Sequence, residues 1–294
     1  MKFLVGYDHH PVSVARMYVR AMRKLGIEVL TIGPRWKGRY SHPEYDDIPD
    51  IEIPRGSPVW RTNFLTDVSQ VDQVWSFDNK FRLRGKLGDG PAVIYCTDPH
   101  VVDAKFYLRE YDYKFSAQKI PGTSWIPLAY DSDLHPCFNN INNISRPIDV
   151  CFIGMTGAGY ENRRAGLKVL DNLELNNFIS SGLVFEEYYR PYNKAKIAYN
   201  WSSSFDIPMR FFEGMAMGCC VVTNRIPFLD ELGFVEGVHY LGFSNIGELE
   251  KVVLEALNSG RWQEVAKKGN LAVQEHSYPN RVIKMLERID YKRG

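Results

Sequence analysis

The sequence of 294 residues lacks several features that mark special environments. No apolar run reaches the length that spans a membrane, and the N-terminus does not have the pattern of a signal peptide. The five cysteines are scattered without a Cys-x-x-Cys pair, so neither a disulfide framework nor a zinc site is indicated. We therefore expect a protein without a membrane span that works with reduced thiols in a cytoplasm, or in the host cytoplasm if its source is viral.

The chain also lacks an excess of charge of either sign. It has 36 Lys and Arg against 35 Asp and Glu, which gives a formal net charge of +1. A local basic face can hide in a neutral total, so this balance neither indicates nor excludes a nucleic-acid partner. There is no internal repeat and no low-complexity tract, and the length suffices for two domains of ordinary size.

The first half of the chain alternates between apolar strands and amphipathic helices. Residues 2–7 are expected to form a buried strand, residues 11–24 a helix with one apolar side, and residues 27–32 the next strand. A strand–helix–strand unit of this length predicts a parallel pair with a right-handed crossover. Further strands are expected at 71–77, 92–96, 112–116 and 124–127. The pattern predicts a doubly wound α/β domain.

A polar, Asn-rich hinge at 131–147 separates this half from a second alternating region. We place the domain boundary there, which gives an N-terminal domain of residues 1–146 and a C-terminal domain of residues 147–276. In the second domain we expect strands at 148–153 and 183–187, and helices at 245–258 and 261–275.

A glycine-rich turn follows the first strand of the second domain. It reads Gly154-Met155-Thr156-Gly157-Ala158-Gly159 and precedes a helix that starts near Glu161. Such a turn suits a phosphate group, because its backbone N–H groups and the helix N-terminus face the anion. A plain tight turn is the alternative.

The most informative stretch is 203–224, which predicts a loop, a helix, a tight turn and a buried strand. Asp206 and Pro208 open the helix, and Gly218 ends it. The apolar run that follows, up to Thr223, has the length of a strand covered on both faces.

Arg210 and Glu213 stand three residues apart and so share one face of this helix. A cation near a helix N-terminus suits a diphosphate. A carboxylate one turn later can accept two hydrogen bonds from the vicinal hydroxyls of a ribose. The alternative is an ordinary intrahelical pair on a solvated face.

The segment from Ile207 to Asn224 resembles the donor-binding segment of group 1 glycosyltransferases. It is closest to the spore-maturation-protein type, in which Pro, Arg and Phe-Glu precede a run of small residues that ends in Gly. The resemblance implies the GT-B fold, two Rossmann-like doubly wound domains facing a cleft, with the terminal helix at 277–294 crossing back to pack on the N-terminal domain. Many relatives carry a second Glu where this sequence has Phe205.

The same resemblance implies that Glu213 holds the ribose of a nucleotide-sugar donor and that Arg210 holds its diphosphate. The resemblance covers residues 147–285 and includes the glycine-rich turn, after which the family often carries an Arg pair. We assign donor binding to Arg210, Glu213, Gly154, Gly157, Arg163 and Asn224. We expect a UDP-sugar as donor substrate, no required cofactor and no metal ion, because residues 147–276 contain no Asp-x-Asp motif.

The first domain offers two polar loops at expected strand ends, where open parallel sheets meet their ligands. One is Asp8-His9-His10 and the other is Thr97-Asp98-Pro99-His100. Asp98, or else His9, is the candidate base for the acceptor hydroxyl in an inverting enzyme. A retaining enzyme needs no protein base, and His100 would then contact the donor sugar. A turn or capping role is the alternative for each residue.

The acceptor stays open at this point. We consider a spore or cell-surface component, a small metabolite, a protein, or a hydroxymethylated base in phage DNA, each receiving a hexosyl or pentosyl group. The DNA hypothesis rests on Arg35, Lys37 and Arg39, which alternate with Trp36 and Tyr40. Basic residues interleaved with aromatic ones suit a phosphate backbone and a flipped base. A merely solvated loop is the alternative.

Three other functions stay open as well. A nucleotide-sugar 2-epimerase of the same fold would release no nucleotide on turnover. A non-catalytic module would bind the nucleotide sugar without transferring it. An NAD-binding protein is disfavoured, because no Gly-x-Gly-x-x-Gly turn follows the opening strand.

Overall fold

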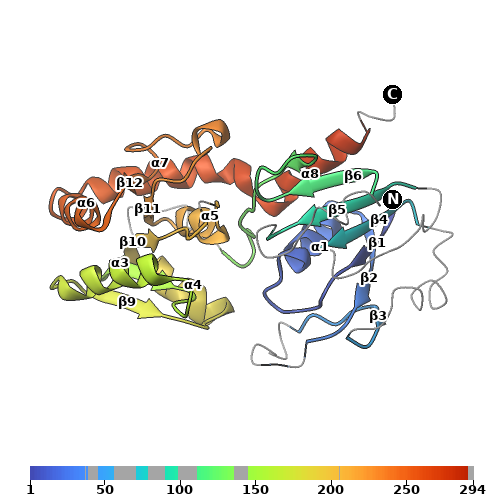
Figure 1. Ribbon diagram of the computed structural model, residues 1–294, viewed down its shortest axis with the longest axis horizontal. Helices are drawn as coiled ribbons and strands as arrows, with labels where there is room; N and C mark the ends of the chain where they lie inside the picture. The colour runs from blue at the N-terminus through green and yellow to red at the C-terminus, as the bar shows by residue number, and fades with distance from the viewer. Residues whose placement is uncertain are drawn as a thin grey trace. The chain divides into compact units, whose positions relative to one another are not determined.

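The computed structural model (Figure 1) describes residues 1–36, 38, 46–55, 71–78, 90–98, 111–135, 145–204 and 206–290. The chain divides into two compact units. The first comprises Met1–Leu128 together with Tyr278–Gly294, and the second comprises Ala129–Ser277. Each unit is built on a parallel sheet with helices, as the alternating sequence pattern predicts.

The first unit has seven described strands: β1 (Lys2–Gly6), β2 (Glu28–Gly33), β3 (Ile51–Glu52), β4 (Gln73–Phe77), β5 (Ala92–Cys96), β6 (Tyr113–Ser116) and β7 (Ser124–Trp125). Their order is β3-β2-β1-β4-β5-β6-β7, and neighbouring strands are parallel. The chain adds β2 and β3 on one side of β1 and then returns to place β4 on the other side. This reversal is a topological switch point, where open parallel sheets bind ligands beyond their carboxyl ends.

Helix α1 (Val14–Lys24) packs against the last helix, α8 (Tyr278–Asp290), within the first unit. The ring of Tyr18 in α1 contacts the ring of Tyr278 in α8, with the two centroids 5.0 Å apart. Arg281 of α8 is buried and donates hydrogen bonds to backbone carbonyls of the same unit. The end of the chain, red in Figure 1, therefore returns to the unit that the N-terminus begins.

The second unit has five described strands: β8 (Ile148–Ile153), β9 (Asn177–Ser180), β10 (Ala195–Asn200), β11 (Cys220–Asn224) and β12 (Leu241–Phe243). Its described α-helices are α3 (Glu161–Asn172), α4 (Phe185–Asn193), α5 (Met209–Ala216), α6 (Ile246–Asn258) and α7 (Arg261–Val273). The strand order is β12-β11-β10-β8-β9, and neighbouring strands are again parallel. The order reverses between β8 and β10, so the switch point of this sheet lies there.

Helices cover both faces of the second sheet, which explains its continuous apolar strands. On one face Phe152, Tyr199 and Val222 belong to a buried cluster with residues of α3 and α6. On the other face α5 rests on β10 and β11. A Cβ atom at Gly214 would lie only 2.9 Å from that of Ala198, so a glycine allows α5 to approach the strands closely.

Two element predictions require correction. The strand expected at 183–187 is wrong, because the strand is β9 and helix α4 already begins at Phe185. A short apolar run does not distinguish a strand from the start of a helix, and two glutamates in the first turn of α4 favour a helix N-terminus. Helix α1 starts at Val14 instead of residue 11, because the side chain of Ser13 caps it.

The boundary between the two units lies between Leu128 and Ala129, ahead of the hinge expected at 131–147. Residues 129–135 belong to the second unit. There the N–H of Tyr130 donates to the carbonyl of His276 at 3.3 Å, and Tyr130 forms a parallel bridge with Ser277. The backbone just ahead of the expected hinge is therefore paired within the second unit, and residues 136–144 of the hinge lie outside the described residues.

We predict that Gly214→Ala lowers the free energy of unfolding by up to about 2 kcal/mol, because overpacking a tight core contact usually costs about 1–3 kcal/mol and alanine regains about 1 kcal/mol of helix propensity. The new methyl group would crowd Ala198 and Val221. Gly247→Ala in α6 is the matched control, because its Cβ atom has ordinary room. Urea unfolding compares the variants, and equal stability of Gly214→Ala and Gly247→Ala would contradict the prediction.

Candidate active site

A guanidinium group lies across the switch point of the second sheet. Arg210, in the first turn of α5, donates from Nε to the carbonyl of Ile153 and from Nη1 to Oδ1 of Asn200, both at 3.1 Å. Ile153 ends β8 and Asn200 ends β10. A positive charge is thus fixed at the place where sheets of this topology bind ligands.

The glycine-rich turn begins beside this guanidinium. A Cβ atom at Gly154 would overlap Nη2 of Arg210. The Gly154 N–H donates to the carbonyl of Ser180 at 3.1 Å, and Arg210 also lies over the ring of Phe152, 4.6 Å from its centroid. A side chain at position 154 would therefore displace the guanidinium of Arg210 from its present place.

Arg163, in α3, braces the same turn. It is buried and donates to the carbonyls of Met155 at 2.7 Å and Trp201 at 2.9 Å, while its guanidinium lies 4.2 Å from the ring centroid of Tyr160. Burial lowers the pKa of Arg163, although an arginine remains charged in proteins. Gly157 differs from Gly154 in its surroundings. A Cβ atom built at Gly157 would have open space around it, so a ligand can approach the backbone there.

Asn224, at the end of β11, holds the backbone that follows β10. Its Oδ1 accepts the N–H of Ser202 at 2.8 Å, and its Nδ2 donates to the Ser202 carbonyl at 3.1 Å. Both residues are buried. The hydroxyl of Ser202 in turn donates to Asp206, ahead of α5, at 2.7 Å. The contacts of Asn224 therefore shape the loop that leads to Arg210.

The carboxylate of Glu213 lies one helical turn after Arg210, and the residue is only 4% exposed. Oε2 accepts the hydroxyl hydrogen of Tyr188 in α4, and Oε1 lies 3.3 Å from Nε2 of His135. The intrahelical pair on a solvated face is therefore not what the structure contains. Arg210 reaches the strand ends, while Glu213 reaches a tyrosine and a histidine.

The sequence patterns do not identify His135 and Tyr188 as site residues. Both contacts join elements that are distant in the chain, so no local spacing reveals them. The nearest signal is Asp131-Ser132-Asp133, which favours a turn just ahead of His135. Oδ1 of Asp131 accepts the N–H groups of Asp133 and Leu134, at 2.9 and 3.3 Å, and so caps this turn.

The described residues give no sign of a metal centre or of a membrane helix. Among those residues, no group of three or more His, Cys, Asp and Glu is placed to hold a metal ion. Asp131-Ser132-Asp133 is an Asp-x-Asp sequence, but it lies ahead of the second sheet and its first carboxylate accepts backbone N–H groups. None of the described helices has the length and apolar character needed to cross a membrane.

A hollow of about 370 Å³ lies at the switch point of the first sheet. Its lining includes Asp8, His10, Asp78 and Asp98, which follow the carboxyl ends of β1, β4 and β5. Asp78 accepts the N–H of Thr97 at 2.6 Å. Asp98, the first candidate base, is thus placed in a hollow with two other carboxylates.

His9, the second candidate base, is placed differently. It is 1% exposed and is not among the residues that line the hollow. Its ring stacks on Tyr7 with centroids 3.9 Å apart, and its Nδ1 lies 3.4 Å from Oδ2 of Asp47. Tyr7 donates to the other oxygen of the same carboxylate. These contacts favour a structural role for His9, whereas His100 lies outside the described residues.

The loop behind the DNA hypothesis is described only in part. Arg35 pairs with Asp46. Arg55 lies over the ring of Trp36, 5.0 Å from its centroid, and 3.4 Å from the carboxylate of Asp8. The remaining residues of the basic and aromatic pattern, Lys37, Arg39 and Tyr40, lie outside the described residues.

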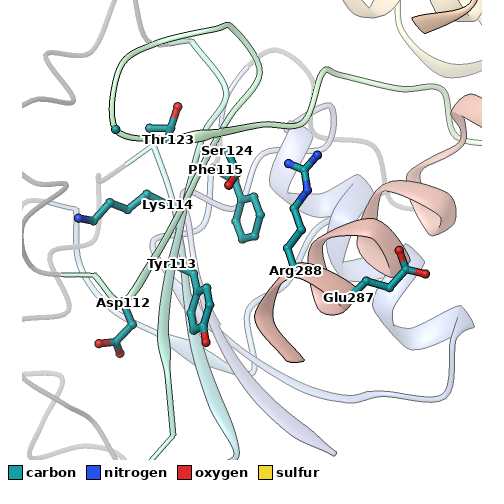
Figure 2. A pocket seen from close by; sticks show the side chains of 9 residues that line it. Asp112, Tyr113, Lys114, Phe115, Thr123, Ser124, Glu287 and Arg288 are labelled. Carbon is teal, nitrogen blue, oxygen red and sulfur yellow. The ribbon is translucent and has the colours of Figure 1, made fainter. Parts of the chain in front are cut away.

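A larger hollow, of about 550 Å³, lies elsewhere on the first unit. Figure 2 shows Asp112 and Lys114 at β6 and Arg288 and Glu287 on α8 around it. Its lining residues Asp112 and Thr123 precede β6 and β7, so this hollow lies at the amino ends of these strands. Ligand sites of doubly wound sheets lie at the carboxyl ends, and we therefore do not take this hollow as the active site.

The two doubly wound units define the class of fold as GT-B, that of glycosyltransferases. Residues 151–287 match the family model described as glycosyl transferase-like. The match includes the glycine-rich turn and helix α5, which carry Gly154, Arg210 and Glu213. None of the curated proteins with which the sequence was compared matches it.

Solved structures resemble the whole chain. HepE of Anabaena, in complex with UDP and glucose, has a TM-score of 0.73 at 13% identity over 99% of this chain and 100% of its own. Sucrose-phosphate synthase of Thermosynechococcus elongatus has a TM-score of 0.68 at 11% identity over 100% of both chains. An alpha-glucosyltransferase, in complex with UDP and a 13-mer DNA, has a TM-score of 0.68 at 13% identity over 99% of both chains. These similarities confirm the expected fold.

We predict that Asn224→Ala lowers the free energy of unfolding by about 1–3 kcal/mol, because it leaves the buried N–H and carbonyl of Ser202 without partners. Asn258→Ala removes an exposed amide at the end of α6 and serves as the control, with an expected change within about 0.5 kcal/mol. Urea unfolding measures both variants. A loss of stability no greater for Asn224→Ala than for the control would show that the pairing with Ser202 is not needed.

Proposed function

We propose that this protein is a glycosyltransferase that moves a sugar from a nucleoside diphosphate, specifically UDP, to an acceptor hydroxyl. The observation that carries the proposal is the fixed guanidinium of Arg210 at the switch point of the second sheet, beside a glycine-rich turn. The match of residues 151–287 to a glycosyl transferase-like family supports it. The motif around Arg210 and Glu213 also leads us to propose the spore-maturation-protein type within group 1.

In this proposal the donor diphosphate lies against Arg210 and the turn from Gly154 to Gly157, and Glu213 binds the ribose. Three residues, a rise of about 4.5 Å, separate the backbone positions of Arg210 and Glu213 along α5. A diphosphate and the ribose next to it can therefore contact both in one pose. Arg163 and Asn224 act indirectly by holding the turn and the loop ahead of α5.

The identity of the nucleotide rests on the structural neighbours. HepE of Anabaena is complexed with UDP and with UDP-glucose, and the alpha-glucosyltransferase is complexed with UDP. We extend this to a UDP-sugar for the present chain, with either a hexosyl or a pentosyl group. The four described cysteines are buried and free, which suits work in a reducing cytoplasm.

The chemical step needs a base for the acceptor and a stabilised leaving group. We propose that Asp98 accepts the proton of the acceptor hydroxyl as its oxygen bonds to the anomeric carbon. The bond from that carbon to the diphosphate breaks at the same time, and its electron pair leaves with the diphosphate. The charge of Arg210 and the N–H groups of the glycine-rich turn offset the negative charge that develops there. A retaining mechanism, with His100 near the donor sugar, is the alternative.

The hollow of the first unit favours an uncharged acceptor. Asp8, Asp78 and Asp98 line it, and three carboxylates disfavour the approach of a phosphate backbone. We therefore propose a hydroxyl of a surface glycan or a small metabolite as acceptor. A hydroxymethylated base in DNA is the second candidate, supported by Arg55 over Trp36 at the same hollow and by the DNA complex of the alpha-glucosyltransferase.

Two rival functions can be separated from transfer by their products. A 2-epimerase would change the donor sugar without releasing UDP, and a non-catalytic module would leave the donor intact. Incubation with UDP-sugars and candidate acceptors, followed by mass spectrometry, distinguishes them. Transfer to neither glycans, metabolites nor hydroxymethylated DNA, with the donor bound but unchanged, would favour the binding module.

We predict that Arg210→Ala weakens UDP binding by about 10- to 150-fold but changes uridine binding little, because charge-assisted bonds to the diphosphate are lost. Glu213→Ala should weaken UDP and uridine alike, by about 1–3 kcal/mol, because both contain the ribose. Calorimetry measures all four affinities. Arg190→Ala, which removes an exposed arginine of α4 paired with Glu186, is the control. Equal losses for UDP and uridine in Arg210→Ala would instead indicate a structural role.

We predict that Asp98→Asn lowers turnover by about 100-fold or more, because it keeps the shape of the side chain and removes its basicity. The affinity for the donor should stay within a few-fold of the wild-type value. His9→Gln tests the second candidate base in the same assay. Near-normal turnover of both variants, with a product that keeps the anomeric configuration of the donor, would decide for the retaining mechanism.

A further inference from the structure

Two side chains from different elements engage the two oxygens of Glu213. Tyr188, in α4, donates its hydroxyl hydrogen to Oε2. His135, in the turn that follows Asp131, places Nε2 at 3.3 Å from Oε1. Both Glu213 and His135 are buried. The sequence motif around Glu213 contains neither residue, so it does not account for these contacts.

The backbone of the turn fixes the proton of His135. Nδ1 lies 3.3 Å from the N–H of Asp131 and accepts its hydrogen. The N–H of His135 donates back to the carbonyl of Asp131 at 2.8 Å, which closes the turn. A ring that accepts at Nδ1 carries its proton on Nε2 in the neutral form. The neutral imidazole is therefore a hydrogen-bond donor aimed at Glu213.

The hydroxyl of Tyr188 is also a donor under ordinary conditions. Burial, and then the charge of Glu213, raises the pKa of Tyr188 well above its usual value, so the hydroxyl keeps its proton. The ring is held by Tyr192, with centroids 5.0 Å apart, and meets His135 edge-on at 6.0 Å. The hydroxyl is thus supported by packing on two sides.

These contacts leave part of the carboxylate unused. An ionised carboxylate has about four acceptor sites, and Tyr188 and His135 occupy two of them. About 6% of the Glu213 side-chain surface remains exposed. A buried carboxylate that is held by two donors cannot rotate freely, so its remaining acceptor sites point in fixed directions.

We propose that His135 and Tyr188 are positioning residues that orient the Glu213 carboxylate toward the 2′- and 3′-hydroxyls of the donor ribose. They thereby determine the preference of the site for ribonucleotides over 2′-deoxyribonucleotides. This inference rests on the proposed function, in which Glu213 binds the ribose. A site built to pair with a hydroxyl rejects an analogue that lacks it, because a polar group is then left unpaired.

The experiment compares UDP with 2′-deoxy-UDP by calorimetry on the full chain. The wild-type protein is expected to bind UDP more tightly by about 10- to 150-fold, the range for one charge-assisted hydrogen bond. In Tyr188→Phe, which removes only the hydroxyl, this preference should fall by about 3-fold or more through a loss of UDP affinity. The affinity for 2′-deoxy-UDP and the melting temperature should stay near the wild-type values.

Three further variants sharpen the test. His135→Phe keeps a ring but removes the donor, so it should lower the ribose preference as Tyr188→Phe does. His135→Gln keeps an N–H that can reach the carboxylate, and it should restore much of the preference. Tyr189→Phe, next to Tyr188 in α4, is the matched control and should leave the preference unchanged.

The possible failures can be told apart. A wild-type preference for UDP that survives both Tyr188→Phe and His135→Phe overturns the inference while the proposed function stands. Equal losses for both nucleotides, together with a lower melting temperature, show that the two residues only support the fold and overturn it as well. If the wild-type protein binds UDP and 2′-deoxy-UDP equally, Glu213 does not bind the ribose hydroxyls and the inference is overturned. If it binds neither nucleotide, the proposed donor itself is contradicted.

Discussion

Two hydrogen bonds from one guanidinium, to the carbonyl of Ile153 and to the side chain of Asn200, tie the start of α5 to the ends of β8 and β10. The residues that surround this guanidinium are arranged around these two hydrogen bonds. The guanidinium lies where a side chain at position 154 would lie, and the Asn200 amide is oriented by donating to Thr223 at 2.9 Å. The cation is therefore held by strand ends, which gives the preorganisation that a binding site requires.

Helix α5 has only eight residues, yet its side chains contact the core, the ends of two strands, and α4 with the turn at 131–135. Phe211 and Met215 are fully buried, and Gly214 lets the helix lie close to the sheet. Arg210 turns toward the strand ends, whereas Glu213 turns toward α4 and the turn at 131–135. The spacing of three residues does place the two charges one turn apart, but neighbouring elements decide which way each side chain points.

The sequence allows prediction where the signal is local. Strands such as β1, β5 and β8 are mostly apolar and buried, and α5 with β11 has a start, an end and a buried face within 22 residues, from Ser203 to Asn224. The strand at β9 could not be predicted in the same way, because its residues are only partly buried and the apolar run after it begins a helix. The contact of His135 with Glu213 and the burial of His9 against Asp47 join distant segments, and no periodicity reports such pairs.

The candidate residues at the two switch points differ in charge: Arg210 lies at the second sheet, whereas Asp8, Asp78 and Asp98 line the hollow at the first sheet, together with Arg55. In the proposed inverting reaction, a cation stabilises the departing diphosphate, and a carboxylate accepts the proton of the acceptor hydroxyl. A carboxylate placed about 4 Å from Arg210 would attract it by about 4 kcal/mol at an effective dielectric constant near 20 and so compete with a ligand anion for it. The hydrogen-bond partners of Arg210 at the strand ends are instead neutral oxygens, and Glu213 is engaged by Tyr188 and His135. Asp98 belongs to the other sheet. The proposed donor-binding cation and the proposed base therefore belong to different units of the chain.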